Sequence, residues 1–160
     1  MSIRNSAKAI IIKSGKLLLN KCENEIQGIY YTLPGGGQNQ NETMEEAVKR
    51  ECLEETGISI SVNKMVGIYE EIQTDEDRQE NYPDYAHKIF HIFLCNISSP
   101  EVHKPVETDE EQISSEWVEI STLSNLNFSP KEISSNIIKL INTKGVLFLG
   151  SKRKNESAST

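Results

Sequence analysis

Short apolar runs bounded by turn residues make up most of the first two thirds of the chain. Ser14-Gly15 separates the first two runs and is typical of a β-hairpin turn. The segment HKIFHIFLCNI, at His87–Ile97, has the strongest strand pattern in the sequence. The predicted strands cover residues 7–12, 17–20, 29–33, 58–71, 87–97 and 117–120.

Two segments carry the start and stop signals of helices. Thr43 is placed as an N-cap with Glu46 completing a capping box, and Gly57 supplies the stop of a helix over residues 43–56. Ser129-Pro130-Lys131-Glu132 offers an N-cap, a first-turn proline and a capping-box glutamate in order. This second pattern predicts a helix from Pro130 to about Asn142.

The order of strands, helix, strands and helix predicts an α/β or α+β fold, with a mixed sheet flanked by helices. A chain of 160 residues fits one domain, which we place at residues 1–150. The polar ending SKRKNESAST predicts a flexible tail over residues 151–160. Residues 73–86 are acidic and contain a proline, so we expect a long loop there.

Composition and charge narrow the function classes. The formal net charge of −7 argues against broad binding to nucleic acid or to anionic membranes. No run approaches the roughly 18 to 20 apolar residues of a membrane-spanning helix, so we expect a cytoplasmic protein. Cys22, Cys52 and Cys95 are odd in number and lack a C-x-x-C pair, so the sequence indicates neither a disulfide framework nor a zinc knuckle and favours buried thiols.

Three glutamates continue the apolar side of the first predicted helix. At about 100° per residue, Glu51, Glu54 and Glu55 follow the stripe that begins at Met44. Carboxylates at such spacings repel one another and raise each other's pKa unless a cation neutralises them. All-oxygen ligation without nearby Cys or His favours Mg²⁺ or Mn²⁺ over zinc, and a metal would recruit phosphate to an acidic protein.

The glycine turn just before this helix adds a phosphate-binding signal. Gly35, Gly36 and Gly37 have no side chains to keep a ligand or metal from the backbone. From Gly36 onward the sequence fits G-x5-E-x7-R-E-U-x-E-E-x-G-U, where U is a bulky apolar residue. The matching residues are Gly36, Glu42, Arg50, Glu51, Cys52, Glu54, Glu55, Gly57 and Ile58.

This pattern is the Nudix box, and the chain resembles a Nudix (MutT-like) hydrolase. Seven fixed identities at typical residue frequencies match by chance at one start with a probability on the order of 10⁻⁸. The one departure is Cys52 at an aliphatic position, where a small hydrophobic thiol can keep the packing role. The resemblance implies the Nudix α/β/α sandwich over roughly residues 3–145.

The resemblance also implies a reaction and its metal ligands. We expect a metal-activated water to hydrolyse a pyrophosphate bond in a nucleoside diphosphate linked to another group. Glu51, Glu54 and Glu55 would bind Mg²⁺ or Mn²⁺, with the carbonyl of Gly35 or Gly36 as a further ligand. These glutamates are therefore both metal ligands and members of the catalytic set.

The resemblance implies that Arg50 completes the catalytic set and braces the loop and helix through an ion pair with Glu42. The family does not fix the general base, and Glu55 and Glu111 are the candidates. Glu111 precedes the tryptophan of TDEEQISSEWVEI by six residues, which resembles a late acidic position of MutT-like members. Glu110 takes its place if the loop is shifted by one residue, and a solvated acidic loop is the alternative for each of them.

Candidate substrate-binding residues lie outside the box. Arg4 and Lys88 are expected to meet a phosphate or a base edge, and Tyr31 is one of several aromatic residues able to stack a base. His87 and His91 share one strand face and are expected to be hydrogen-bonded within the sheet rather than to line a cleft.

The substrate follows only from weaker likenesses. The segments AIIIKSGKLLLNK, YYTLPGGG and HKIFHIFLC resemble the ADP-ribose pyrophosphatase branch, so ADP-ribose or a related nucleotide sugar is the leading expectation. The alternatives are a house-cleaning (d)NTP pyrophosphohydrolase and a catalytically silent nucleotide-sensing module. RNA decapping is disfavoured by the net acidity. The expected partner is a nucleotide, without a membrane or strong nucleic-acid binding, and the chain is expected to be a monomer or a homodimer.

Overall fold

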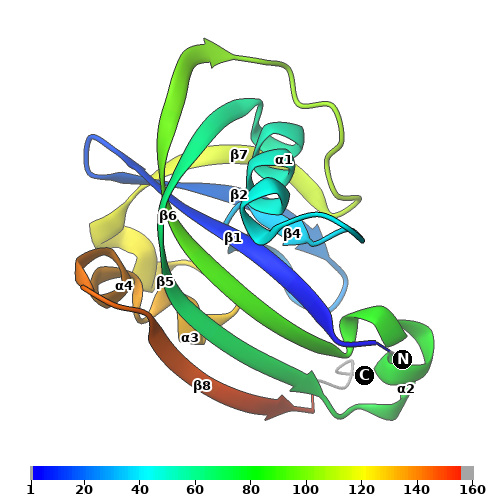
Figure 1. Cartoon of the computed structure of the whole chain (residues 1–160). Helices are drawn as coiled ribbons and strands as arrows, with labels where there is room; N and C mark the ends of the chain where they lie inside the picture. The colour runs from blue at the N-terminus through cyan, green and yellow to red at the C-terminus, as the bar shows by residue number, and fades with distance from the viewer. Residues whose placement is uncertain (1, 156–160) are drawn as a thin grey trace.

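A mixed β-sheet bent into two halves forms the centre of the computed structural model, which describes residues 2–155 (Figure 1). Its strand order is β3-β2-β1-β6-β5-β8, with β4 beside β1 and β7 beside β2. The strands are β1 (Arg4–Lys13), β2 (Lys16–Asn24), β3 (Gly28–Thr32), β4 (Gly35–Gly37), β5 (Ile58–Gln73), β6 (His87–Val102), β7 (Gln112–Glu119) and β8 (Leu147–Lys154). The α-helices are α1 (Met44–Thr56), α2 (Glu76–Asn81), α3 (Lys131–Ser134) and α4 (Ile137–Asn142), with 3₁₀ helices η1 (Pro83–Tyr85) and η2 (Ile120–Asn125).

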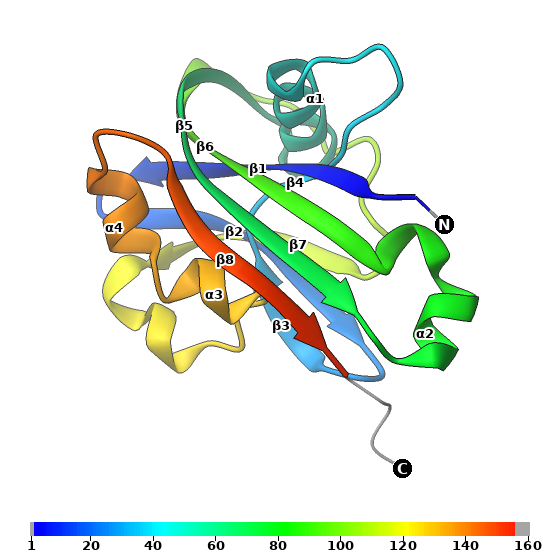
Figure 2. The same cartoon turned by 60° about the horizontal axis from the view of Figure 1, so that its bottom comes forward.

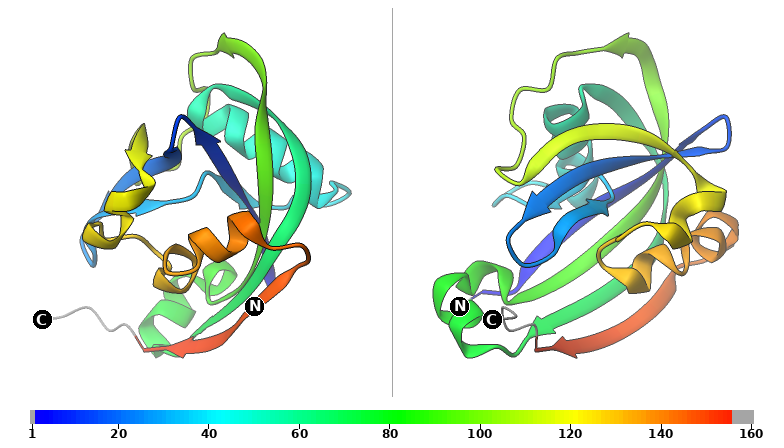
Figure 3. Two further views of the ribbon diagram at one scale, coloured as in Figure 1. Left: turned by 90° about the vertical axis from the view of Figure 1, so that its left-hand side faces the viewer. Right: turned by 180° about the vertical axis from the view of Figure 1, so that it is seen from behind.

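The two halves of the sheet separate at the first hairpin. Ser14 and Gly15 both have positive φ, 52° and 74°, which is the backbone of a type I′ turn and confirms the predicted hairpin. The pairing of β1 with β2 is confined to the residues next to this turn, after which β1 pairs in parallel with β6 and β2 pairs with β3 and β7. The halves therefore diverge, and α3 and α4 lie in the space between them (Figure 3).

Helices cover both faces of the sheet half that contains β1, β6 and β5. Figure 2 shows α1 on one side and α3 with α4 on the other. The core between α1 and the sheet includes Ala7, Ala9, Ile11, Phe93 and Cys95 from the sheet and Ala47, Val48 and Cys52 from the helix. The core between the halves includes Ile10, Leu17, Leu19, Tyr69, Phe90, Ile92, Phe128, Ile133, Ile137 and Leu140. The predicted α/β/α sandwich with a mixed sheet is confirmed.

The first predicted helix is confirmed together with its capping signals. The Thr43 hydroxyl accepts from the Glu46 backbone N–H at 3.1 Å, and the Glu46 carboxylate accepts from the Thr43 N–H at 2.8 Å. Gly57 ends the helix in the left-handed conformation. Cys52 lies on the buried face of α1 and is completely buried, which confirms its packing role. All three cysteines are free and buried.

The prediction of a structureless loop over residues 73–86 was wrong, because this segment contains α2 and η1. Asp75 caps α2 by accepting from the Arg78 backbone N–H at 3.0 Å. The sequence pattern did not predict this helix, because none of its residues is buried and its sequence therefore has no apolar periodicity.

The single helix predicted from Pro130 to Asn142 was also wrong, since the structure divides it into α3 and α4. Pro130 rather than Ser129 is the N-cap residue of α3, and no side chain caps this end. At the break, the Asn136 side-chain amide donates to the Glu132 carbonyl at 2.7 Å, a bond that competes with the helical backbone ladder.

The prediction of a flexible tail over residues 151–160 was wrong for residues 151–154, which form part of a strand. Ser151 to Lys154 lie in β8, which pairs in parallel with the far end of β5, and residues 156–160 lie outside the described part of the chain. Polar side chains hold this strand, because Lys154 contacts Glu71 at 2.8 Å and Lys152 contacts Glu132 at 2.8 Å. Within residues 2–155, no helix has the length and apolar character needed to span a bilayer.

Candidate active site

The three glycines of β4 allow close contacts that a side chain would block. Gly35 has φ +133°, and a Cβ there would lie 2.9 Å from the carbonyl carbon of Ala7 on the neighbouring β1. A Cβ on Gly36 would lie 2.6 Å from the carboxyl carbon of Glu51, and one on Gly37 would lie 2.5 Å from the guanidinium carbon of Arg4. The glycine strand thus lets an acidic and a basic side chain lie directly against the backbone.

Arg50 forms the predicted ion pair with Glu42 and also neutralises two further carboxylates. Its Nε and Nη2 donate to the two oxygens of Glu42 at 2.6 and 3.0 Å, which confirms the pair. Its Nη1 donates to Glu51 at 2.8 Å and to Glu54 at 3.2 Å, while Nη2 also reaches the Gly37 carbonyl at 3.0 Å. The hydrogen bond from Arg50 lowers the pKa of Glu42, so both groups stay charged.

Glu55 lies in a different environment from Glu51 and Glu54. Glu55 is 8% exposed. Its Oε2 accepts from the Asn20 side-chain amide at 2.8 Å, and its Oε1 accepts from the Gly35 backbone N–H at 2.7 Å. Burial raises the pKa of Glu55 to about 7, against the opposing effects of the Lys8 charge and the Gly35 hydrogen bond. This carboxyl group is therefore held in a fixed position and can gain or lose a proton near neutral pH.

Lys8 belongs to the site, although the sequence analysis did not select it. Its Nζ donates to the Gly35 carbonyl at 2.8 Å and lies 3.3 Å from the Leu33 carbonyl oxygen. It therefore fixes the entry to the glycine strand from the face of β1 opposite α1. A single charged residue inside the apolar run AKAIII was the signal that could have identified it.

A hydrogen-bonded group behind Glu55 sets the orientation of Asn20. The Asn20 side-chain oxygen accepts from Ser115 Oγ at 2.9 Å, and Gln112 Nε2 lies 3.4 Å from it. Gln112 Nε2 also donates to the Glu55 backbone carbonyl at 3.0 Å. Because the amide oxygen is occupied by donors, the amide nitrogen of Asn20 must face the Glu55 carboxylate.

The Asn20→Ala substitution is expected to lower the free energy of unfolding by about 2 kcal/mol, because it leaves buried donors and a carboxylate oxygen without partners. Urea denaturation measures the loss, with the exposed Asn125→Ala as a matched control. An Asn20→Ala midpoint equal to that of the control would contradict the structural role.

The candidate base Glu111 lies beside β2 and β3. Its carboxylate accepts from the Tyr30 hydroxyl through a short hydrogen bond and from the Asn24 amide at 3.1 Å. Another carboxylate of the same loop, Asp109, is among the charges that raise the pKa of Glu55. The loop before β7 thus brings Asp109 into the electrostatic environment of the site, a residue that the sequence analysis did not single out.

The donor chemistry of the site fits a hard divalent cation. Among residues 2–155, no three His, Cys, Asp or Glu side chains are grouped closely enough to form a ready metal site. Arg50 accounts for this arrangement, because it holds Glu51 and Glu54 while Glu55 is bound to Asn20. The acidic oxygens nevertheless all come from one helix, and the missing side chain of Gly36 leaves room for the Glu51 carboxylate.

The predicted substrate-binding residues separate into two groups. Arg4 and Lys88 are direct partners on adjacent strands, and the Arg4 guanidinium lies 4.7 Å from the centre of the Tyr85 ring. Lys88 Nζ lies 3.7 Å from a Glu71 oxygen, and burial lowers the pKa of this lysine. Tyr31, in contrast, packs against the core between the two sheet halves.

Both strand histidines are paired within the sheet, as expected. His87 Nε2 lies 2.9 Å from a Glu70 oxygen, and His91 Nε2 lies 3.3 Å from the Asn5 side-chain oxygen. Both histidines lie on the same face of β6 as Phe93, which packs beneath α1.

Comparisons with known proteins agree with this arrangement. The family model described as the NUDIX domain matches residues 3–147. An ADP-ribose pyrophosphatase of Methanocaldococcus jannaschii is 30% identical over 130 residues, which are 81% of this chain and 70% of the relative. The structure of an ADP-ribose pyrophosphatase from Streptococcus suis aligns with a TM-score of 0.61 at 20% identity, over 95% of this chain and 98% of the other. A MutT protein from Bacillus halodurans aligns with a TM-score of 0.69 at 18% identity, over 98% and 94% of the two chains.

Proposed function

Because the chain belongs to the Nudix hydrolase family, we propose that it uses Mg²⁺ or Mn²⁺ to hydrolyse a pyrophosphate bond in a nucleotide sugar, with ADP-ribose as the leading substrate. The observation that carries the proposal is that Glu51 and Glu55 of α1 both contact the glycine strand, while Glu54 shares the Arg50 Nη1 donor with Glu51. The name of the archaeal relative supports the choice of ADP-ribose.

In this proposal Glu51 and Glu54 are metal ligands and Glu55 is the candidate base. Glu51 and Glu54, which now contact Arg50, would hold the cation together with the carbonyl of Gly35 or Gly36. When bound, the cation would supply a water of lowered pKa and would neutralise charge on the phosphoryl oxygens. Arg50 keeps its bond to Glu42 and so holds the helix against the glycine strand.

Glu55 is the stronger of the two candidate bases. Its buried carboxyl group has a pKa of about 7, which suits a group that accepts a proton near neutral pH. Glu111 is instead an exposed residue, and its Oε2 accepts from Tyr30 and Asn24.

Positive charge for the substrate comes from the face of β1 and β6 opposite α1. Arg4, Lys8 and Lys88 lie on this face, and the charges of Arg4 and Lys8 both act on Lys88. Such a basic surface allows a protein with a net charge of −7 to hold the phosphates of a nucleotide.

The proposal is tested by assaying ADP-ribose, dinucleoside polyphosphates, NADH and the (d)NTPs with added Mg²⁺ or Mn²⁺. We expect AMP and ribose 5-phosphate from ADP-ribose, and no turnover in excess chelator because the carboxylates alone cannot activate water. Release of pyrophosphate from a (d)NTP with ADP-ribose left intact would instead support the house-cleaning activity. Full activity in chelator would refute metal dependence.

A catalytically silent sensing module is disfavoured because every acidic residue of the box is present. The assay separates this alternative as well, since a sensor would bind nucleotides without turning any of them over. The cytoplasmic location and the monomeric or dimeric state stay predictions.

A further inference from the structure

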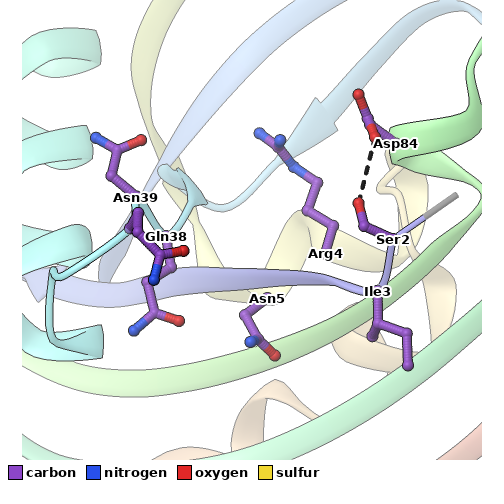
Figure 4. Close-up of a pocket in the computed structure, with 8 residues that line it drawn as sticks. Ser2, Ile3, Arg4, Asn5, Gln38, Asn39 and Asp84 are labelled. Atoms are coloured by element: carbon purple, nitrogen blue, oxygen red, sulfur yellow. Dashed lines mark hydrogen bonds between the residues drawn. The ribbon is translucent and has the colours of Figure 1, made fainter.

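A polar pocket of about 350 Å³ lies between the start of β1, the loop before α1 and the 3₁₀ helix η1. Figure 4 shows the Arg4 side chain rising between Asn39 and Gln38 on one side and Asp84 on the other. The lining of the pocket is made almost entirely of amide, hydroxyl and charged side chains, and Arg4 also belongs to the basic surface proposed to hold the phosphates.

One wall of the pocket is tied to the Nudix box. The Gln38 backbone N–H donates to the Asn5 carbonyl at 2.9 Å, and its side-chain amide donates to the Glu42 carbonyl at 2.6 Å. The Asn39 backbone N–H donates to Glu42 Oε2 at 2.9 Å, the same oxygen that accepts from Arg50 Nη2 at 3.0 Å. Glu42 therefore fixes this wall relative to the helix that carries the catalytic glutamates.

The opposite wall comes from the segment between β5 and β6. The Tyr85 ring packs against the Arg4 guanidinium, with the guanidinium carbon 4.7 Å from the ring centre. The Ser2 hydroxyl donates to the Asp84 carboxylate at 3.2 Å. The segment that was predicted as a loop thus closes the pocket against the first strand.

Several polar groups of the pocket remain available to a ligand. Within the described part of the chain, the Arg4 guanidinium and the side-chain amides of Asn39 and Gln40 make no hydrogen bond to the protein. The Glu42 carboxylate links the pocket to the catalytic glutamates, because it accepts from the Asn39 backbone N–H and from Arg50. Arg50 Nη1 in turn donates to Glu51 and to Glu54.

We propose that this pocket binds the sugar attached to the second phosphate of the substrate, through the hydroxyl groups of that sugar. Each hydroxyl both donates and accepts a hydrogen bond, and the free amides of Asn39 and Gln40 offer both functions. The residues that line the pocket include no aromatic side chain on which a nucleobase could stack, and the neighbouring Tyr85 ring packs against the Arg4 guanidinium. The inference deepens the proposed function and rests on a nucleotide sugar being the substrate.

The test compares the binding of D-ribose 5-phosphate and methyl phosphate to the intact protein in the presence of Mg²⁺, followed by NMR titration. The wild-type protein is expected to bind ribose 5-phosphate at least about tenfold more tightly, because methyl phosphate lacks the ring hydroxyls. The double substitution Asn39→Ala with Gln40→Ala is expected to abolish this preference. The exposed Asn63→Ala serves as the control and is expected to keep it.

The titration distinguishes failure of the pocket from failure of the proposed substrate. Equal binding of the two phosphates by the wild type, or an unchanged preference in the double variant, would overturn the sugar site even if ADP-ribose is hydrolysed. A preference that disappears only in the double variant supports the site, even if the enzyme assay identifies a substrate other than ADP-ribose. The side-chain amides of Asn39 and Gln40 can be removed without breaking a side-chain hydrogen bond within the described residues, so the double variant is expected to fold.

Discussion

The Glu54→Gln substitution is expected to lower kcat by roughly a thousandfold while the fold persists. Glutamine keeps the shape of the side chain but removes the charge with which Glu54 would bind a divalent cation. The Glu54 side chain is 28% exposed, and its contact with Arg50 at 3.2 Å is one of several that Arg50 makes. Loss of this contact therefore costs little stability.

The measurement is kcat with saturating Mg²⁺ and the best substrate of the assay, together with the thermal midpoint of unfolding. Glu45→Gln is the matched control, because Glu45 is an exposed glutamate in the first turn of the same helix. A Glu54→Gln enzyme within about threefold of the control would exclude Glu54 from the catalytic set.

The Gly35→Ala substitution is expected to destabilise the protein by more than about 3 kcal/mol. The backbone of Gly35 has φ +133°, a conformation that alanine rarely adopts, and the new methyl group would lie well inside contact distance of the Ala7 carbonyl oxygen. Relief of this clash requires β4 to move away from β1, which would also displace the N–H that donates to Glu55.

Gly28→Ala separates the steric effect from the backbone effect. Gly28 also has positive φ, +66°, but no atom lies within 4 Å of the position of its added methyl group. Its cost is expected to be about 1 kcal/mol, from the left-handed backbone alone. Equal urea midpoints for the two variants would mean that contact with β1 does not restrict Gly35.

Local signals in the sequence were sufficient for α1 and its acidic residues. Thr43, Glu46 and Gly57 interact with atoms fewer than five residues away, so the helix boundaries follow from short-range hydrogen bonds. The fixed spacing of the box likewise determines that Arg50 and Glu54 are one helical turn apart. The Ser14-Gly15 hairpin belongs to the same class, because its turn depends on two residues.

The elements that were predicted wrongly depend on contacts with distant parts of the chain. Polar β8 is a strand because it pairs with β5 and because Lys154 reaches Glu71, more than eighty residues earlier in the sequence. The exposed helix α2 carries no buried residue, and the 3₁₀ helix that follows it contacts Ser2 and Arg4, about eighty residues earlier in the sequence. Hydrophobic periodicity contains no information about either arrangement.

The sequence by itself determined the capped helix and the spacing of Glu51, Glu54 and Glu55, because these depend on neighbouring residues. The predicted glycine turn is a strand, because it pairs with β1. Only the tertiary structure decided the surroundings that give these glutamates different properties. Asn20 and Lys8 reach Glu55 and Gly35 from other strands, 35 and 27 residues away in the sequence. The pairing of β1 with β4 places Lys8 opposite Gly35, and the pairing of β2 with β3 and β7 positions Asn20. These registers depend on how the whole sheet buries its two faces.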